Sequence, residues 1–169
     1  MSKKEKILKG KTHKLGDNIN TDYIISGRYK FKTLNNELLA KHLLEDIDPK
    51  FYQKISPGDF IVAGENFGCG SSREQAPLAI KYAKIGAVLA KSFARIFYRN
   101  AINIGLPIII TETEKISDNQ ELLIDLVKGE IHILKTGLTI PIKPFPPQIL
   151  QIIEAGGLVE YFKKYGGKF

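Results

Sequence analysis

Residues 64–74 read Gly64-Glu65-Asn66-Phe67-Gly68-Cys69-Gly70-Ser71-Ser72-Arg73-Glu74, and the rest of the chain is arranged around them. An apolar run at residues 60–63 precedes this stretch, and a helical pattern follows it from about Ala76. Glycines permit positive φ angles and let a ligand approach the backbone closely. Two serines and Arg73 then stand near a helix N-terminus, where free N–H groups and the helix dipole favour an anion. The stretch therefore predicts a carboxylate or phosphate site on a strand-loop-helix corner.

The spacing in this loop excludes three better-known glycine motifs. A P-loop needs a lysine directly before its hydroxyl residue, but Gly70 precedes Ser71. A dinucleotide fingerprint that begins at Gly68 needs glycine or alanine where Arg73 stands. The Gly-x-Ser-x-Gly nucleophile elbow is also absent from the loop.

A simple helix start is the structural alternative to an anion site. Ser71 with Glu74, and Ser72 with Gln75, each fit the pattern of a capping box. Pro77 argues against a helix that already runs from Ser71, because proline has no N–H and clashes with the carbonyl four residues earlier. We therefore expect Ser71–Glu74 to form a separate turn and the regular helix to begin near Pro77.

The composition indicates one globular domain over residues 1–169. The chain is 43% hydrophobic and 25% charged, which suffices for one sizeable core. It has neither a membrane-length apolar run nor a secretory signal pattern, so the expected location is the cytoplasm. A single cysteine, Cys69, cannot form an internal disulfide or hold a metal cluster by itself.

The net charge of +7 does not by itself indicate nucleic acid. Lysines gather at the two ends of the chain, which is typical of solvated tails, and we find no nucleic-acid motif. We therefore expect no nucleic-acid partner. A positive field instead suits small polyanionic substrates.

The order of the expected elements indicates an α/β domain. Short apolar strands alternate with helices through the middle of the chain, which favours a parallel sheet. We expect Asn35 or Asn36, and Ser92, to cap helices at their starts and Gly105 to end one. The expected strands cover residues 7–15, 60–63, 87–90, 106–110, 121–127, 130–134 and 138–142, and the expected helices cover residues 34–45, 77–84, 92–103, 145–155 and 158–162.

Residues 20–33 are too polar and glycine-punctuated for a clean strand. We expect a functional loop with a short extended core at Tyr23–Ile25. Asp22, within it, has two interpretations that the residues leave open: it closes a turn through its own backbone, or it orients a ligand. On the helix expected from Ser92, one face carries Phe93, Ile96, Phe97 and Ala101, and we interpret this face as core.

Two motifs in order resemble a known family. They are residues 62–74, around the glycine loop, and Lys91-Ser92-Phe93-Ala94-Arg95-Ile96-Phe97-Tyr98-Arg99-Asn100-Ala101-Ile102-Asn103-Ile104-Gly105-Leu106-Pro107. The segments at 20–22 and 154–158 also fit. These motifs resemble the small subunits of the 3-isopropylmalate dehydratase family, which are similar to the swivelling C-terminal domain of aconitase. The resemblance covers nearly the whole chain and implies a swivelling domain of β/β/α architecture.

The resemblance also implies an activity and a partner. The reaction is a hydro-lyase isomerisation in leucine biosynthesis, which moves a hydroxyl of a di- or tricarboxylate substrate between neighbouring carbons by dehydration and rehydration. A separate large subunit, in a heterodimer or heterotetramer, carries the [4Fe–4S] cluster, and Cys69 is not one of its ligands. Ser71 is the implied base, and Asp22 helps to orient groups on the cluster side. Ser72 and Arg73 bind a substrate carboxylate, with Arg73 suited to a bidentate contact.

Substrate choice is expected in the loop after Asp22. Relatives that act on substrates with an extra carboxylate, such as homoaconitate, have a Tyr-Leu-Arg-Thr pattern where this chain has residues 29–33. Without a gap, Phe31 aligns with that arginine, and an apolar residue there favours the alkyl group of isopropylmalate. Lys30 or Lys32 reaches a carboxylate if the register shifts by one residue.

Two alternatives remain beside isopropylmalate dehydratase. One is the small subunit of a homoaconitase or of a hydro-lyase for citramalate or dimethylmalate. The other is a non-enzymatic anion- or RNA-binding module on the same fold, motivated by the positive charge. The tandem serines Ser71 and Ser72 argue against the second, because a binding module does not need them.

Overall fold

The computed structural model of the protein describes residues 6–29 and 35–166. The strands are β1 (Ile7–Lys14), β2 (Phe60–Val62), β3 (Ala87–Ala90), β4 (Ile108–Ile110), β5 (Glu121–Asp125), β6 (Glu130–Ile133) and β7 (Thr139–Pro141). The helices are α1 (Thr21–Ile24), α2 (Asn36–Lys41), α3 (Phe51–Lys54), α4 (Gln75–Tyr82), α5 (Arg95–Asn103), α6 (Pro147–Ala155) and α7 (Leu158–Tyr165), with 3-10 turns at Gly27–Tyr29 and Thr113–Lys115.

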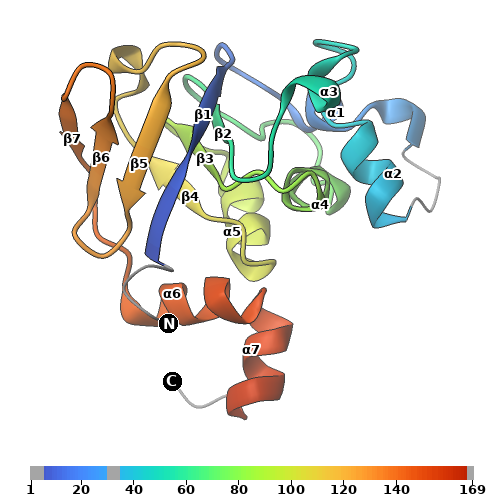
Figure 1. Cartoon of the computed structure of the whole chain (residues 1–169). Helices are drawn as coiled ribbons and strands as arrows, with labels where there is room; N and C mark the ends of the chain where they lie inside the picture. The colour runs from blue at the N-terminus through green and yellow to red at the C-terminus, as the bar shows by residue number, and fades with distance from the viewer. Residues whose placement is uncertain (1–5, 30–34, 167–169) are drawn as a thin grey trace.

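The strands form one mixed sheet in the order β4-β3-β2-β1-β5-β6-β7. Strand β1 joins its two halves, because it pairs in parallel with β2 and antiparallel with β5. The half β1–β4 is parallel, as expected for strands linked through helices, and the half β5–β7 is antiparallel with hairpin connections. Figure 1 shows α1, α2 and α4 to one side of the sheet, and α6 and α7 below it.

Each face of the sheet carries its own apolar core. Ile61, in the middle of β2, packs in the cluster beneath α1, α2, α4 and α5. Its neighbours Phe60 and Val62 pack in the second cluster, with β5, β6 and α6. A strand buried on both faces needs a continuous apolar run, and this is why residues 60–63 and 87–90 predicted their strands correctly.

The predicted extended core at Tyr23–Ile25 is wrong. Residues Thr21–Ile24 form the short helix α1, because the Asn20 side chain accepts a hydrogen bond from Tyr23 N at 3.0 Å and caps the turn. Asp22 therefore does not close this turn. Asn35 is confirmed as the cap of α2, with its Oδ1 2.9 Å from Leu38 N.

The starts of α4 and α5 are among those that differ from the expectation. Helix α4 begins at Gln75, so Pro77 lies within its first turn, where an N–H has no partner inside the helix to lose. Helix α5 begins at Arg95, and Ser92 is not its cap. The Ser92 hydroxyl accepts instead from Asn66 N at 2.8 Å.

A half-buried lysine joins the ends of α5 and α6. Lys81 Nζ donates to the carbonyls of Ile104 and Gly156, both at 2.7 Å, and burial lowers the pKa of this ammonium. Backbones meet at the same point, since a Cβ on Gly105 would lie 2.9 Å from Gly157 N. Gly105 has the left-handed φ of 80° expected of a residue that ends a helix.

Asp59 ties the start of β2 to β1. His13 Nε2 lies 2.8 Å from its Oδ2, and the backbone N–H groups of Lys11 and Ser56 donate to its two oxygens. Burial raises the pKa of Asp59, but these hydrogen bonds outweigh burial and hold the pKa below its ordinary value. Within residues 6–29 and 35–166, no helix has the length and apolar character needed to cross a membrane.

We predict that Asp59→Asn destabilises the fold in a pH-dependent way. Since the folded-state pKa lies below the unfolded-state value, ionised Asp59 stabilises the fold at neutral pH, and this contribution is lost as the pH falls below about 4. We expect the substitution to lower the free energy of unfolding by about 1–3 kcal/mol at pH 7 and by progressively less under acid conditions. Urea denaturation at several pH values measures both effects.

The matched control is Glu112→Gln, which removes an exposed carboxylate that has no ion pair with a described residue. We expect it to change stability by less than about 0.5 kcal/mol. An Asp59→Asn effect that is equal at pH 7 and pH 3 would contradict the role given to the ionised carboxylate.

Candidate active site

The Gly64–Glu74 loop is held against the segment that leads into α1. Gly68 N donates to Ile19 O at 2.7 Å, and Thr21 N donates to Cys69 O at 2.9 Å. The Thr21 hydroxyl donates to Ser71 O at 2.7 Å. Three bonds therefore fix the loop backbone just before the tandem serines.

The other side of the loop is bonded to the segment before α5. Phe67 N donates to Ser92 O at 3.0 Å, and Ala94 N donates to Phe67 O at 2.9 Å. The Phe67 ring is fully buried and packs edge-on against Phe93 and Phe97, with ring centroids 5.9 and 5.2 Å apart. The two motifs that are separated in the sequence thus form one structural unit.

Two loop positions have no room for a side chain. A Cβ on Gly68, whose φ is 81°, would lie 2.2 Å from Cγ of the Phe97 ring. A Cβ on Gly64 would overlap the Asp17 carboxylate, which accepts a hydrogen bond from Glu65 N at 2.7 Å. Glycine at these positions is a requirement of close packing, and at Gly68 also of backbone conformation.

Arg73 is a buried cation, and some of its N–H donors have no acceptor among the described residues. Its side chain is 9% exposed, and its Nη2 lies 2.5 Å from Oδ1 of Asp22, whose side chain is 55% exposed. Its Nε and Nη1 are buried and have no hydrogen-bond partner among the described residues. Leaving charged donors unpaired is costly, so two nitrogens in this state indicate a position that a bound anion completes.

A cavity of about 220 Å³ opens at this arginine. Its wall combines the glycine loop with the first turns of α5, so the second sequence motif contributes directly to it. Arg95 and Asn100 are the polar residues there that the sequence did not predict as part of a site. The cavity is lined by Thr21, Gly68, Gly70, Ser72, Arg73, Ala94, Arg95, Ile96, Phe97 and Asn100.

The two serines have different surroundings. Both are exposed, but Ser72 lines the cavity beside Arg73, whereas Ser71 does not line it and its hydroxyl makes no hydrogen bond within the described part of the chain. Neither serine caps α4, because its N-cap is Glu74 and no side chain bonds there. The capping boxes that the spacing allowed are therefore wrong, and both hydroxyls are available for a ligand.

The face of α5 interpreted as core is only partly so. Phe97 and Ala101 are buried, as predicted. Ile96 is 54% exposed and lines the cavity, because the helix turns this position toward the anion site. Helical periodicity identified the apolar side of α5, but it does not show which residues of that side are exposed to solvent.

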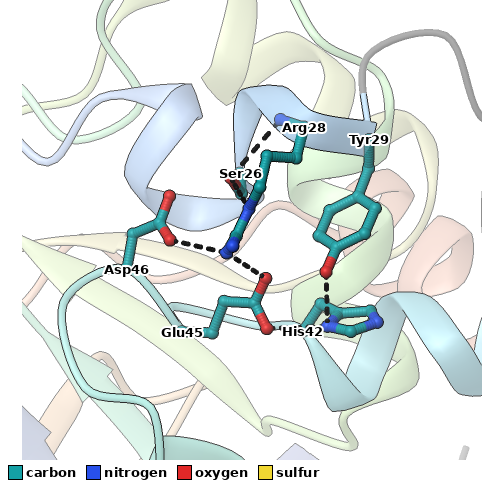
Figure 2. A network of polar contacts seen from close by, with 6 residues as sticks. All are labelled: Ser26, Arg28, Tyr29, His42, Glu45 and Asp46. Atoms are coloured by element: carbon teal, nitrogen blue, oxygen red, sulfur yellow. Dashed lines mark hydrogen bonds and ion pairs between the residues drawn. The ribbon is translucent and has the colours of Figure 1, made fainter.

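A polar network stands beside the site (Figure 2). Arg28 Nη2 lies 3.0 Å from both Glu45 Oε1 and Asp46 Oδ1, and its Nε donates to Ser26 Oγ at 3.2 Å. His42 Nδ1 lies 2.7 Å from Glu45 Oε2 and 3.1 Å from the Tyr29 hydroxyl. Burial and the contact with Glu45 raise the pKa of Tyr29. The network bridges residues 26–29 and 42–46.

The predicted specificity residues Lys30, Phe31 and Lys32 lie outside the described residues. The chain that leads to them passes the site, because a Cβ on Gly27 would be 3.8 Å from Arg73 Nη2. Their contribution to substrate choice stays a prediction. The sequence offered one signal for the polar network that precedes these residues, namely the opposite charges of Arg28 and of Glu45 and Asp46.

A metal centre is not evident in the parts of the chain that the structure covers. Across residues 6–29 and 35–166, no three His, Cys, Asp or Glu side chains gather in a way that could hold a metal ion. Cys69 is a free, half-buried thiol in the loop. The contacts of His13 and His42 are described above. The third histidine, His132 on β6, contacts the Thr139 hydroxyl through Nδ1 at 3.0 Å.

Comparison with known proteins agrees with this geometry. The family model described as the aconitase C-terminal domain matches residues 28–113, about half of the chain, and includes the loop, α4 and α5. The chain belongs to the aconitase C-terminal domain family, together with the small subunits of 3-isopropylmalate dehydratase. The fold class expected from the sequence, an α/β swivelling domain as in aconitase, is thereby confirmed.

The relatives define the group within that family. The 3-isopropylmalate dehydratase small subunit 2 of Archaeoglobus fulgidus is 55% identical over 93% of this chain and 95% of its own. The methanogen homoaconitase small subunit of Methanothermobacter thermautotrophicus is 50% identical over 95% and 93%. A crystal structure titled 3-isopropylmalate dehydratase, from Methanocaldococcus jannaschii, superposes with a TM-score of 0.89 at 53% identity and covers 95% of both chains.

We predict that Gly68→Ala destabilises the fold by about 2–4 kcal/mol, since the new methyl group meets the Phe97 ring and the backbone keeps a positive φ. Thermal or urea denaturation measures this loss. The matched control is Gly16→Ala, where a Cβ meets nothing within 4 Å, and its effect should stay within about 0.5 kcal/mol. Equal stability of the two variants would show that the loop does not lie against α5.

Proposed function

We propose that this chain is the small subunit of a 3-isopropylmalate dehydratase, which interconverts 2-isopropylmalate and 3-isopropylmalate in leucine biosynthesis by loss and return of water. The observation that carries the proposal is the buried Arg73 guanidinium at a cavity that Ser72 also lines, with two nitrogens that find no partner among the described residues. Such a group recognises a carboxylate in bidentate fashion. The names and full-length coverage of the relatives support the substrate class.

Asp22 and Arg73 act together in substrate binding. Asp22 holds Nη2 and so orients the guanidinium plane, while Nε and Nη1 keep a hydrogen-bonding capacity that no described residue uses. Ser72 supplies a hydroxyl from the same cavity wall. Held in this way, the substrate presents the C–H bond next to its carboxylate in a fixed orientation.

Ser71 is the base that removes this proton. Its hydroxyl is exposed and free of hydrogen bonds to the described residues, as a group that must meet a substrate requires. A serine hydroxyl is a weak base at neutral pH and needs a positive environment that stabilises its alkoxide. Arg73, two residues away, and the net charge of +7 contribute to that environment. The proton returns from Ser71 to carbon when water adds back.

This chain carries only part of the catalytic centre. Its described residues do not fit an iron–sulfur cluster, because Cys69 is the one cysteine of the sequence and no metal-binding group surrounds it. We assign the [4Fe–4S] cluster to a separate large subunit, with which the chain forms a heterodimer or heterotetramer. Residues 1–169 then act as a single swivelling domain that covers the cluster side of the site. We place the complex in the cytoplasm.

Homoaconitase is the second candidate function. One relative with 50% identity is named a methanogen homoaconitase small subunit, so the family contains both activities at similar distance from this chain. Phe31 favours the alkyl group of isopropylmalate, whereas Lys30 and Lys32 would favour the additional carboxylate of homoaconitate. The choice between the two is a question of substrate and leaves the roles proposed for Ser71 and Arg73 unchanged.

We predict that Ser71→Ala lowers kcat of the reconstituted two-subunit enzyme by a factor of about 10²–10⁴, the usual contribution of a general base. KM should change little, and circular dichroism should show an unchanged fold because Ser71 is exposed. Ser56→Ala, at an exposed serine before β2, is the matched control and should retain the parent rate. A Ser71→Ala enzyme with the parent kcat would place the base elsewhere.

We also predict that the enzyme prefers isopropylmalate to homoaconitate. The chain is mixed anaerobically with its large subunit and reconstituted cluster, and kcat/KM is measured for both substrates. Phe31→Arg should shift the ratio toward homoaconitate, since a guanidinium pairs with the extra carboxylate. A parent enzyme that prefers homoaconitate would overturn the role given to Phe31.

A further inference from the structure

Strand β4 leaves one edge of the sheet open. Among the strands of residues 6–29 and 35–166, it is the last in the order and pairs with β3 alone. Thr111 N donates to Ala90 O, and Val88 N donates to Pro107 O, so residues 107, 109 and 111 turn their backbone groups toward β3. Because successive residues of a strand point to opposite edges, the N–H and C=O groups of Ile108 and Ile110 point outward. Neither residue bonds outward to any other described residue.

The open edge faces a large groove. A cavity of about 650 Å³ is bounded by α5, by all three residues of β4 and by the segment from Ile142 into α6. Its surface is mainly apolar, with contributions from Ile102, Ile142 and Phe145. The Ile110 side chain is 56% exposed there, an unusual exposure for the third residue of an all-isoleucine strand. An edge strand of this kind is a template for pairing with another chain unless something covers it.

The charge of the groove selects its occupant. Its lining includes three cations, Arg95, Arg99 and Lys143, and no acidic residue. None of the three forms an ion pair within residues 6–29 and 35–166. A second copy of this chain would bring the same cations together across the β4 edges, which is unfavourable for a protein of net charge +7. The complementary occupant is an extended segment with acidic and apolar side chains.

The groove and the anion site share one lining residue. Arg95, at the start of α5, lines both the 220 Å³ cavity beside Arg73 and the 650 Å³ groove. Both sites therefore adjoin the start of α5, so one partner could contact the two of them.

We infer that β4 is a docking strand for the large subunit, which adds an extended, acidic segment to its free edge and seats apolar side chains in the groove. The choice of partner rests on the proposed function. Backbone hydrogen bonds to Ile108 and Ile110 provide affinity, and the groove and its arginines provide specificity, as in other cases of strand addition. The edge contributes to association, and the chemistry stays with the glycine loop.

The test is Ile110→Pro, which removes an N–H that points away from β3 and so leaves the parent sheet bonds intact. We expect the Kd for the large subunit, measured by calorimetry, to rise about ten-fold or more. Ile110→Thr keeps the N–H and the strand propensity and is the matched control, with a smaller rise. Arg99→Glu should also raise this Kd, and by a larger factor at low salt than at high salt. At saturating large subunit, kcat of all three should equal that of the parent.

Hydrogen exchange gives an independent measurement without substitution. The Ile110 amide should exchange fast in the free chain and at least about 100-fold more slowly in the complex. Parent affinity of Ile110→Pro, an unprotected amide in the complex, or self-association of the chain through this edge would each overturn the inference. A complex that forms through β4 but does not turn over isopropylmalate would contradict the proposed function and leave the docking strand standing.

Discussion

The functional architecture depends on one close approach, that of the Gly68 backbone to the Phe97 ring. The loop and α5 belong to successive strand-helix units, and without this contact they would be separate corners of the sheet. With it, the Phe67 ring packs edge-on against both Phe93 and Phe97, and the loop is bonded to the segment before α5. The Arg73 cavity is the space that remains between these two elements, so its shape is set by apolar packing rather than by the polar residues that line it.

The parallel half of the fold could be predicted because its sequence signal is simple. Strands β2 and β3 are buried on both faces, and a continuous apolar run admits few alternatives. The short helices were less accessible. The single turn at Thr21–Ile24 exists because Asn20 caps it and the glycine loop holds Thr21, and neither contact is visible in a local pattern. Ser92 looked like a helix cap, but its hydroxyl is used by Asn66, which is distant in sequence.

The candidate site, like the fold, could be predicted from the sequence only in part. The glycines, serines and Arg73 could be chosen from the sequence, since their chemistry is concentrated in eleven consecutive residues. The pairing of Asp22 with Arg73, and the presence of Arg95 and Asn100 at the cavity, depend on how distant segments meet. The family resemblance brought the second motif forward, yet only packing showed that its first helical turns form a wall of the cavity. Residues of this kind need the tertiary structure.

At Arg73, the stability of the fold and the binding of a ligand favour different side chains. Two of the guanidinium nitrogens are removed from water without an acceptor among the described residues, so the fold of the free chain bears the cost of burying them. A methionine of similar length would remove that cost, and it would also remove the reason for the cavity. Selection for a more stable chain and selection for a working one therefore act in opposite directions at this position. A bound carboxylate supplies acceptors to the arginine. Because it binds the folded state, it also raises the free energy of unfolding.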